Sequence, residues 1–373
     1  MGMMKFKVSF FAFLLILLFD SWVYRYNVAH TGTYSGKNLP TLEKLRWRFK
    51  TNGTIYSTPA VVDNTVYFGS NDGYFYAVDL KAGELKWKFK TGNTIETSPA
   101  FLRIQNKKVS NAQTERIYFG SNDKNFYCLD ARTGKVIWKF KVEGWLMSSP
   151  IIVDSIVYFG SGEGVLYAVS ALNGNLVWKF QAQKAIYSSP AYSDGKIYFG
   201  SLDKNFYAVD SKTGNLIWIV STEGMINSSP VVFGGTVFFG SNDGKLYAVD
   251  SRSGWVKWKF QIKGQITQTP AVDDKAIYFS SADGALYIVS HDGKLLWKIA
   301  LDEVSLWSSP VVAGDYVYSA VNTATYSGIY KLNRRTGKME SAFDLPHRAF
   351  ASPVIVDGVL LVGSKDGYLY AIE

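Results

Sequence analysis

The sequence predicts an all-β protein, an eight-bladed β-propeller of four-stranded antiparallel blades, from three observations. A block of about forty residues recurs and reads S-S-P, a short apolar run, Y-F-G-S-x-D-G, Y-A-V-D, x-x-T-G and W-K-F-K. Turn residues separate the short β-type segments of each block. The last block stops at Glu373 before its W-K-F-K segment, and an additional copy of that segment, 46–50, precedes the first block. The prolines that mark the blocks are Pro59, Pro99, Pro150, Pro190, Pro230, Pro270, Pro310 and Pro353.

Four strands are expected in each block, separated by turns rich in glycine and aspartate. The second strand has no charged face, since Val66 and Phe68 alternate with Tyr67 and Gly69. A sheet that is buried on both faces needs neighbours on both sides, and an open stack would need polar capping repeats, which neither end shows. A closed ring satisfies every blade, and an N-terminal strand completes the last one. In the first block the expected strands are 57–62, 66–70, 74–79 and 85–90.

A tryptophan recurs on the last strand of the blocks, as in the first block, where Trp87 follows the turn glycine Gly83. Such a ring can cover the turn of the neighbouring blade and bury a large apolar area. We interpret the series as structural docking, and we expect looser packing in the seventh block, where Ser341 replaces the tryptophan. The docking series comprises Trp47, Trp87, Trp138, Trp178, Trp218, Trp258 and Trp297.

The chain has a formal net charge of +9, and much of the positive charge falls on lysines that alternate with aromatic residues, as in Trp87-Lys88-Phe89-Lys90. Lysine on an exposed edge strand protects that strand from pairing with another chain. We therefore interpret the basic residues as structural and expect no nucleic-acid partner. The single cysteine, Cys128, excludes an intramolecular disulfide and is expected to be a small buried residue.

The N-terminus resembles an export segment. Lys5 and Lys7 precede an apolar run, 8–19, which as a helix would span only ~18 Å. No good cleavage site follows and no lipid-bearing cysteine is present, so we interpret 1–20 as a signal sequence or an uncleaved membrane anchor. The lysines favour export of the remainder to the periplasmic or extracellular side. A connector at 21–42 and a propeller at 43–373 are expected to follow.

Two stretches carry the pattern A-x-D-x-x-T-G-x-x-x-W: 208–218 in full, and 128–138 with cysteine in the leading place. This pattern resembles the pyrroloquinoline quinone (PQQ)-like repeat family, the tryptophan-docking eight-bladed propellers. The resemblance implies the fold but leaves activity open. The family contains quinone-dependent alcohol and sugar dehydrogenases, and also non-catalytic members such as the propeller lipoprotein of the outer-membrane assembly machine. The long dehydrogenases hold their cofactor against a disulfide of adjacent cysteines and a calcium ion, and one cysteine cannot form that disulfide.

The residue three places before each marker proline differs from block to block, while its flanks vary much less. In a propeller these loops ring the mouth of the central channel, and packing alone does not explain the variety. We predict that the mouth binds a partner peptide or a glycan. The predicted site comprises Tyr56, Glu96, Met147, Tyr187, Asn227, Thr267, Trp307 and Phe350.

The sequence shows no catalytic or metal-binding constellation. His30, His291 and His347 are scattered over loops, and turn aspartates such as Asp72 fit hairpin chemistry better than calcium binding. We therefore favour a non-catalytic, exported or membrane-anchored scaffold of the cell envelope that binds another envelope protein.

Two alternatives stay open. One is a PQQ-dependent dehydrogenase of reduced form, which is disfavoured because its candidate calcium ligands, Glu96 and Asn227, belong to separate blades. The other is a glycan-binding surface protein. Glycan cleavage is disfavoured, since a hydrolase needs two carboxylates and the predicted mouth offers only Glu96.

Overall fold

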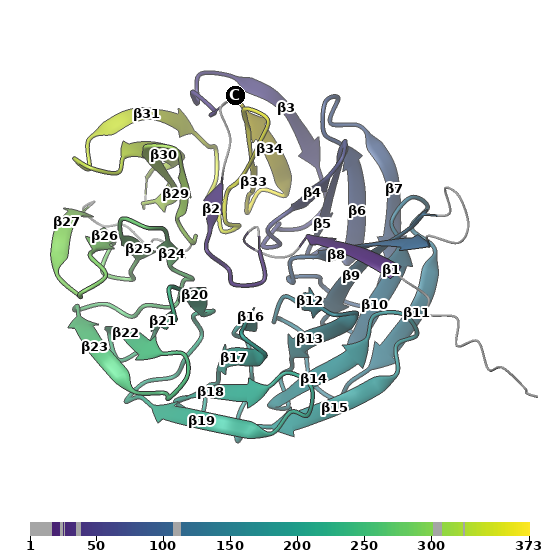
Figure 1. The fold of residues 1–373 in the computed structure, drawn as a ribbon. Helices are drawn as coiled ribbons and strands as arrows, with labels where there is room; N and C mark the ends of the chain where they lie inside the picture. The colour runs from purple at the N-terminus through teal and green to yellow at the C-terminus, as the bar shows by residue number, and fades with distance from the viewer. Residues whose placement is uncertain are drawn as a thin grey trace, which may run out of the picture.

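The computed structural model describes residues 17–22, 25, 27–34, 39–106, 113–300, 308–323 and 325–373. These residues form eight sheets, which are arranged as blades around a central axis (Figure 1). In blades 1 to 7, four consecutive antiparallel strands follow one another from the axis to the rim. The predicted eight-bladed propeller is thereby confirmed.

Blade 1 shows how the repeat becomes structure. Its innermost strand begins at Ala60 rather than at 57, because Pro59 has no N–H with which to join a strand ladder. Gly73 adopts a positive φ of 79° and closes the turn between the second and third strands. The four strands are β4 (Ala60–Val62), β5 (Thr65–Gly69), β6 (Tyr74–Asp79) and β7 (Leu85–Lys90).

The next six blades repeat this order. Blade 2 is β8 (Ala100–Asn106), β9 (Gln113–Ser121), β10 (Asn125–Asp130) and β11 (Val136–Lys141), and blade 3 is β12 (Ile151–Val153), β13 (Ile156–Gly160), β14 (Val165–Ser170) and β15 (Leu176–Gln181). Blade 4 is β16 (Ala191–Ser193), β17 (Lys196–Gly200), β18 (Asn205–Asp210) and β19 (Leu216–Ser221), and blade 5 is β20 (Val231–Phe233), β21 (Thr236–Gly240), β22 (Lys245–Asp250) and β23 (Val256–Gln261). Blade 6 is β24 (Ala271–Val272), β25 (Ile277–Ser280), β26 (Ala285–Val289) and β27 (Leu295–Ala300), and blade 7 is β28 (Val311–Ala313), β29 (Tyr316–Asn322), β30 (Ser327–Asn333) and β31 (Met339–Asp344).

Blade 8 is completed by the start of the chain, as predicted. The N-terminal strand pairs antiparallel with the last strand, and Trp47 lies opposite Ala371. Backbone N–H groups of Lys44 and Glu373 each donate to the other residue's carbonyl, at 3.0 and 2.9 Å. From the axis outward the strands are β32 (Val354–Val356), β33 (Val359–Gly363), β34 (Tyr368–Ile372) and β3 (Leu45–Lys50).

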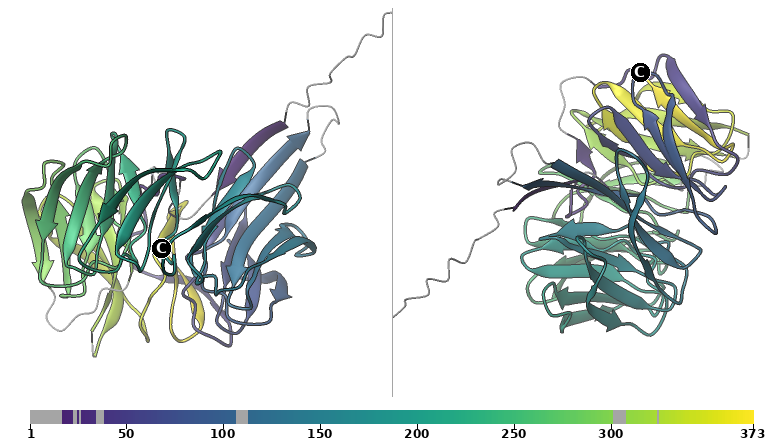
Figure 2. Two further views of the ribbon diagram at one scale, coloured as in Figure 1. Left: turned by 90° about the horizontal axis from the view of Figure 1, so that it is seen from below. Right: turned by 90° about the vertical axis from the view of Figure 1, so that its right-hand side faces the viewer.

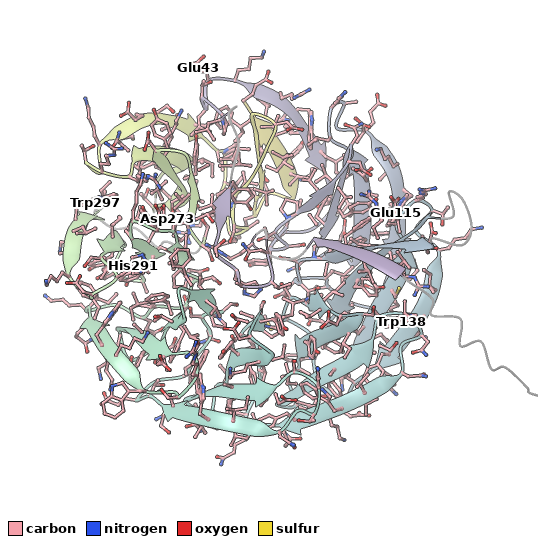
Figure 3. The ribbon with its side chains drawn as sticks, viewed as in Figure 1. Glu43, Glu115, Trp138, Asp273, His291 and Trp297 are labelled. Atoms are coloured by element: carbon pink, nitrogen blue, oxygen red, sulfur yellow. The ribbon has the colours of Figure 1, made fainter. Side chains whose placement is uncertain are left out.

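In every blade except blade 7, the outermost strand carries a tryptophan that lies over the next blade. In blade 1, Nε1–H of Trp87 donates to the carbonyl of Ala131 at 3.0 Å, and its ring covers Gly134, where an added Cβ would lie 2.6 Å from the indole. Trp138 and Trp297 show the same position on opposite sides of the ring (Figure 3). Corresponding hydrogen bonds to the next blade are made by Trp47, Trp178, Trp218 and Trp258.

The joint between blades 7 and 8 is filled differently. The third and fourth strands of blade 8, β34 and β3, are not consecutive in the sequence, so no turn between them lies opposite position 341 for a tryptophan to cover. Instead, the Ser341 hydroxyl donates to the carbonyl of Thr41 at 2.6 Å, and Leu42 is buried in the core shared by these two blades. The connector therefore occupies the joint at which looser packing was expected.

The insertion at 101–116 lengthens two strands of blade 2 into a hairpin that extends beyond the ring (Figure 2). An additional strand, β1 (Leu17–Trp22), pairs antiparallel with β8. The predicted boundary at residue 20 therefore falls within a strand, while 1–16 lie outside the described residues. Within the described part of the chain, no helix is long and apolar enough to cross a membrane.

Candidate functional site

Two kinds of loop form the upper face of the ring, the face that carries the loops before the marker prolines. In blade 1 they are the connecting loop 51–59 and the turn 70–73. The N–H of Asn71 donates to the carbonyl of Thr54 at 2.9 Å, which fixes the turn against the loop. The mouth of the channel therefore has a rigid frame where the loops are described, because the same tie recurs at Asn122, Gly162, Leu202, Asn242, Ala282 and Lys365.

Turn aspartates form a second set of hydrogen bonds between the turn and the connecting loop. The Asp72 carboxylate accepts the N–H of Asn52 at 3.0 Å, the N–H of Tyr74 at 2.9 Å and the hydroxyl of Tyr76 at 2.7 Å. These bonds use the oxygen atoms that a cation would need. No group of three or more metal-binding side chains occurs among the described residues. The same tyrosine contact recurs at Asp123, Asp203, Asp243, Asp283 and Asp366.

The mouth holds a cavity of about 180 Å³. Trp307 lies outside the described residues, so its place at the mouth stays a prediction. The remaining residues of the predicted site all line this one cavity: Tyr56, Glu96, Met147, Tyr187, Asn227, Thr267 and Phe350. Side chains that are far apart in the sequence are thus brought together.

A belt of hydroxyl groups lies directly below these residues. The serine or threonine before each marker proline is buried. Six bonds link neighbouring blades, and in each of them the side-chain oxygen accepts the backbone N–H of the corresponding residue in the preceding blade. Sequence reasoning recognised the residue type but not this circular network. The bonds, between 2.9 and 3.2 Å, join Thr58 to Ser98, Ser98 to Ser149, Ser149 to Ser189, Ser189 to Ser229, Thr269 to Ser309 and Ser352 to Thr58.

One sector of the mouth combines aromatic rings with a carboxylate. Tyr56 of blade 1 and Phe350 of blade 8 stack at 5.2 Å with an interplanar angle of 25°. Glu96 of blade 2 is half-buried, and burial raises the pKa of its carboxyl group. Burial, and the Glu96 charge as a smaller cause, raise the pKa of Tyr56. Glu96 is the only charged side chain among the described residues that line the cavity.

The connector passes through the ring beneath the mouth (Figure 1). Its carbonyl groups accept N–H groups from the innermost strands of blades 4, 5, 6 and 7, and β2 (Thr33–Tyr34) pairs in parallel with β28. The pairs, between 2.8 and 3.0 Å, are Val28 with Tyr192, Ala29 with Val232, Thr31 with Val272, and Gly32 with Val312. Sequence reasoning missed this role of the connector because 25–34 occurs once, so no other copy of the segment could be compared with it.

Two buried side chains hold the connector in place. Arg25 is 2% exposed, and its Nη2 donates to the carbonyls of Pro270 and Pro310 at 3.0 and 2.8 Å. Gly32 has a φ of 63°, and an added Cβ there would lie 1.9 Å from Arg25 Nη2. His30 is fully buried, with Nδ1 3.2 Å from the carbonyl of Pro230. Burial and, to a smaller extent, the Arg25 charge lower the pKa of His30 to about 3.

The chain matches two known protein families. Residues 101–373 match the family described as the β-propeller of the beta-alanine-activating enzyme, and 30–147 match the β-propeller domain of glucose, ethanol and alcohol dehydrogenases of the PQQ type. The first match spans more than half of the chain, so the protein belongs to this β-propeller family. The resemblance to PQQ-type propellers is confirmed.

Two curated relatives are similar over a short stretch. The human beta-alanine-activating enzyme is 26% identical over 85 residues, and the mouse enzyme is 28% identical over 88 residues. Each alignment covers 22% of this chain and 8% of the enzyme. The comparison therefore concerns a small part of those enzymes.

Solved structures share the fold at low sequence identity. BamB from Moraxella catarrhalis has a TM-score of 0.71 at 18% identity and covers 88% of this chain and 96% of BamB. A europium-containing methanol dehydrogenase has a TM-score of 0.74 at 16% identity, covering 92% and 90% of the two chains. The computationally designed Ika8 protein has a TM-score of 0.72 at 18% identity, covering 90% and 99%.

The mouth does not fit the quinone cofactor that this fold family includes. Pyrroloquinoline quinone is a planar tricarboxylate, so its site needs cationic partners or a metal ion. The described cavity lining offers neutral groups and one carboxylate, Glu96. Glu96 and Asn227 belong to blades 2 and 5, so their side chains start from separate parts of the ring rather than from one coordination site.

Proposed function

We propose that this protein is a non-catalytic binding scaffold of the cell envelope, which captures a partner protein at the mouth of the propeller. The observation that carries the proposal is the contrast between two adjacent rings of residues. The hydroxyl belt is nearly uniform from blade to blade, whereas the residues above it differ and line one cavity. The uniform residues hold the blades together, whereas varied residues on such a rigid frame are suited to recognition of a partner.

The chain itself supports this assignment in two further ways. The connector lies in the ring under the mouth and is hydrogen-bonded to blades 4 to 7, so this part of the ring has a fixed support. A preorganised surface loses less freedom on binding than a mobile one. In addition, Glu96 is the one carboxylate among the described residues that line the cavity, whereas glycoside hydrolysis needs a pair.

Export and anchoring are part of the proposal. β8 runs from Ala100, next to the upper face, to Asn106, and β1 pairs with it so that Leu17 lies opposite Asn106. A membrane anchor that precedes Leu17 would therefore attach at the lower side of the ring. In that arrangement the mouth would face away from the membrane, where a partner can approach it.

Site-specific photocrosslinking in intact envelopes tests the proposal. A photoreactive residue at Tyr187, on the mouth, is expected to give one discrete protein adduct. The same residue at Lys81, which is exposed on a turn of the lower side, serves as the control. An adduct at Lys81 with none at Tyr187 would move the interface to the lower side, and adducts at neither position would argue against a protein partner.

A further inference from the structure

We infer that the mouth has a cation subsite: the sector formed by Phe350, Tyr56 and Glu96 receives an arginine or lysine side chain of the partner. This inference rests on the proposed function and specifies the chemistry of the same mouth. Three observations carry it: an aromatic pair in which Tyr56 is exposed, a carboxylate with spare hydrogen-bonding capacity, and the position of the buried Arg25.

The aromatic pair presents a surface that suits a cation. Tyr56 and Phe350 come from adjacent blades and stack at 5.2 Å, and Tyr56 remains 39% exposed although it lies in the cavity lining. The faces of aromatic rings carry negative potential, so they attract ammonium and guanidinium groups. The stacked pair offers a rigid wall for the long stem of a basic side chain.

Glu96 supplies the opposite charge. Its carboxylate has four lone-pair positions, and the one hydrogen bond that it accepts from the described residues comes from Asn122 Nδ2 at 3.4 Å, which is long. Glu96 and Tyr56 lie on loops of adjacent blades and line the same cavity, so the two groups belong to one sector. A half-buried carboxylate with so few donors gains most from a cation that brings its own N–H groups.

The buried positive charge of the channel lies across the ring from this sector. Arg25 is hydrogen-bonded to Pro270 and Pro310, at the start of blades 6 and 7, whereas Glu96 belongs to blade 2. A basic side chain in the cation subsite would therefore sit away from Arg25. Three exposed basic residues of blade 8, His347, Arg348 and Lys365, lie outside the described cavity lining, where water and salt screen their charges.

A neutral glycan would use the aromatic pair and the hydroxyl belt but would not need the charge of Glu96. The removal of that charge therefore separates the two ligand classes. Glu143 provides a matched control, because it is an exposed glutamate on the connecting loop of the next blade and does not line the cavity.

The experiment measures binding of N-acetyl-Ala-Arg-Ala-amide, its lysine counterpart and its citrulline counterpart by NMR titration of the intact protein. The arginine and lysine peptides are expected to bind the wild type at least tenfold more tightly than the citrulline peptide, which has a similar shape and no charge. Glu96→Gln should abolish that difference, while Glu143→Gln should retain it. A thermal unfolding curve of each variant checks that the fold is intact.

Two outcomes would overturn the inference: equal binding of the arginine and citrulline peptides, or an unchanged preference in Glu96→Gln. Displacement of the arginine peptide by a neutral envelope oligosaccharide, with Glu96→Gln binding that sugar normally, would assign the sector to a glycan instead. The photocrosslink at Tyr187 distinguishes failure of the cation subsite from failure of the scaffold proposal. If it captures the partner in both wild type and Glu96→Gln, the scaffold proposal stands and the cation subsite falls.

Discussion

The indole Nε1–H of Trp178 donates a hydrogen bond of 3.0 Å to the backbone carbonyl of Ser211, a residue of the next blade. The bond fixes the angle between two neighbouring sheets that share no strand pairing. Because the ring also covers Gly214, one side chain supplies both a polar and an apolar contact across the joint. The repeated tryptophan is therefore the means by which blades of nearly identical sequence are held at one angle around a ring.

Replacement of this tryptophan should cost a large part of the stability of the protein. We expect Trp178→Ala, at a side chain that is 9% exposed, to lower the free energy of unfolding by about 3–5 kcal/mol, measured by urea denaturation. Trp255 is the matched control, since it is 75% exposed. Its replacement by alanine should change stability by about 0.5 kcal/mol or less. Equal losses in the two variants would contradict the docking role.

Two glycines with the same backbone conformation allow the stability cost of steric contact to be distinguished from that of backbone strain. Gly214 and Gly195 both have a φ of 74°, but an added Cβ lies 2.6 Å from Trp178 at Gly214 and meets nothing within 4 Å at Gly195. Gly195→Ala should cost about 1–2 kcal/mol through backbone strain alone. Gly214→Ala should cost about 1–3 kcal/mol more, because the indole must move.

A double-mutant cycle checks the origin of that excess. In a Trp178→Ala background the methyl group of Gly214→Ala has room, so the cost of the glycine substitution should fall to the value measured for Gly195→Ala. An excess that persists without the indole would show that the tryptophan is not its cause.

A tryptophan at position 341 should destabilise the protein even though it restores the repeat consensus. Ser341 contacts Thr41, and the buried Leu42 already fills the joint between blades 7 and 8. We expect Ser341→Trp to cost about 1–3 kcal/mol through overpacking, as measured by urea denaturation. Ser341→Ala, which removes only the hydrogen bond to Thr41, should cost about 0.5–1.5 kcal/mol. A gain of stability in Ser341→Trp would mean that the connector leaves the joint open.

The fold could be predicted from the sequence because each blade is built from the same residue pattern, which recurs along the chain. Most blocks carry the same turn glycines and the same alternation of buried and exposed residues, so a strand that is unclear in one block can be recognised from the others. The split last blade followed from the additional strand at 46–50, which pairs with the final strand. The position of the mouth residues followed from their constant distance to each proline, as for Glu96 and Pro99.

The features that sequence reasoning missed are those that occur once. The connector at 25–34 has no repeat to compare it with, and its polar residues are typical of an exposed linker. Its burial depends on carbonyl groups of blades 5 to 7, such as those of Pro270 and Pro310, which come together at Arg25 in the folded ring. The contact between Ser341 and Thr41 was hidden for the same reason, since 300 residues separate the two partners.

Stability should depend on pH through His30. Burial and, to a smaller extent, the Arg25 charge lower the pKa of this histidine to about 3 in the folded protein, whereas an exposed histidine in the unfolded chain titrates near ~6.5. Between these values the unfolded state binds one more proton than the folded state, so stability is full above pH ~6.5 and is lost as the pH falls. The expected loss from this residue is about 1.4 kcal/mol per pH unit below 6.5.

The measurement is a series of urea denaturation curves from pH 7.5 to 4.5 for the wild type, His30→Asn and His291→Asn. Asparagine cannot be protonated in this range, so His30→Asn should be less stable at pH 7.5 but should lose stability more slowly on acidification. His291 is exposed on a lower turn, so His291→Asn should follow the wild-type slope. Parallel curves for the wild type and His30→Asn would mean that the imidazole takes up its proton without leaving the folded state, and that the connector does not seal this part of the ring from water.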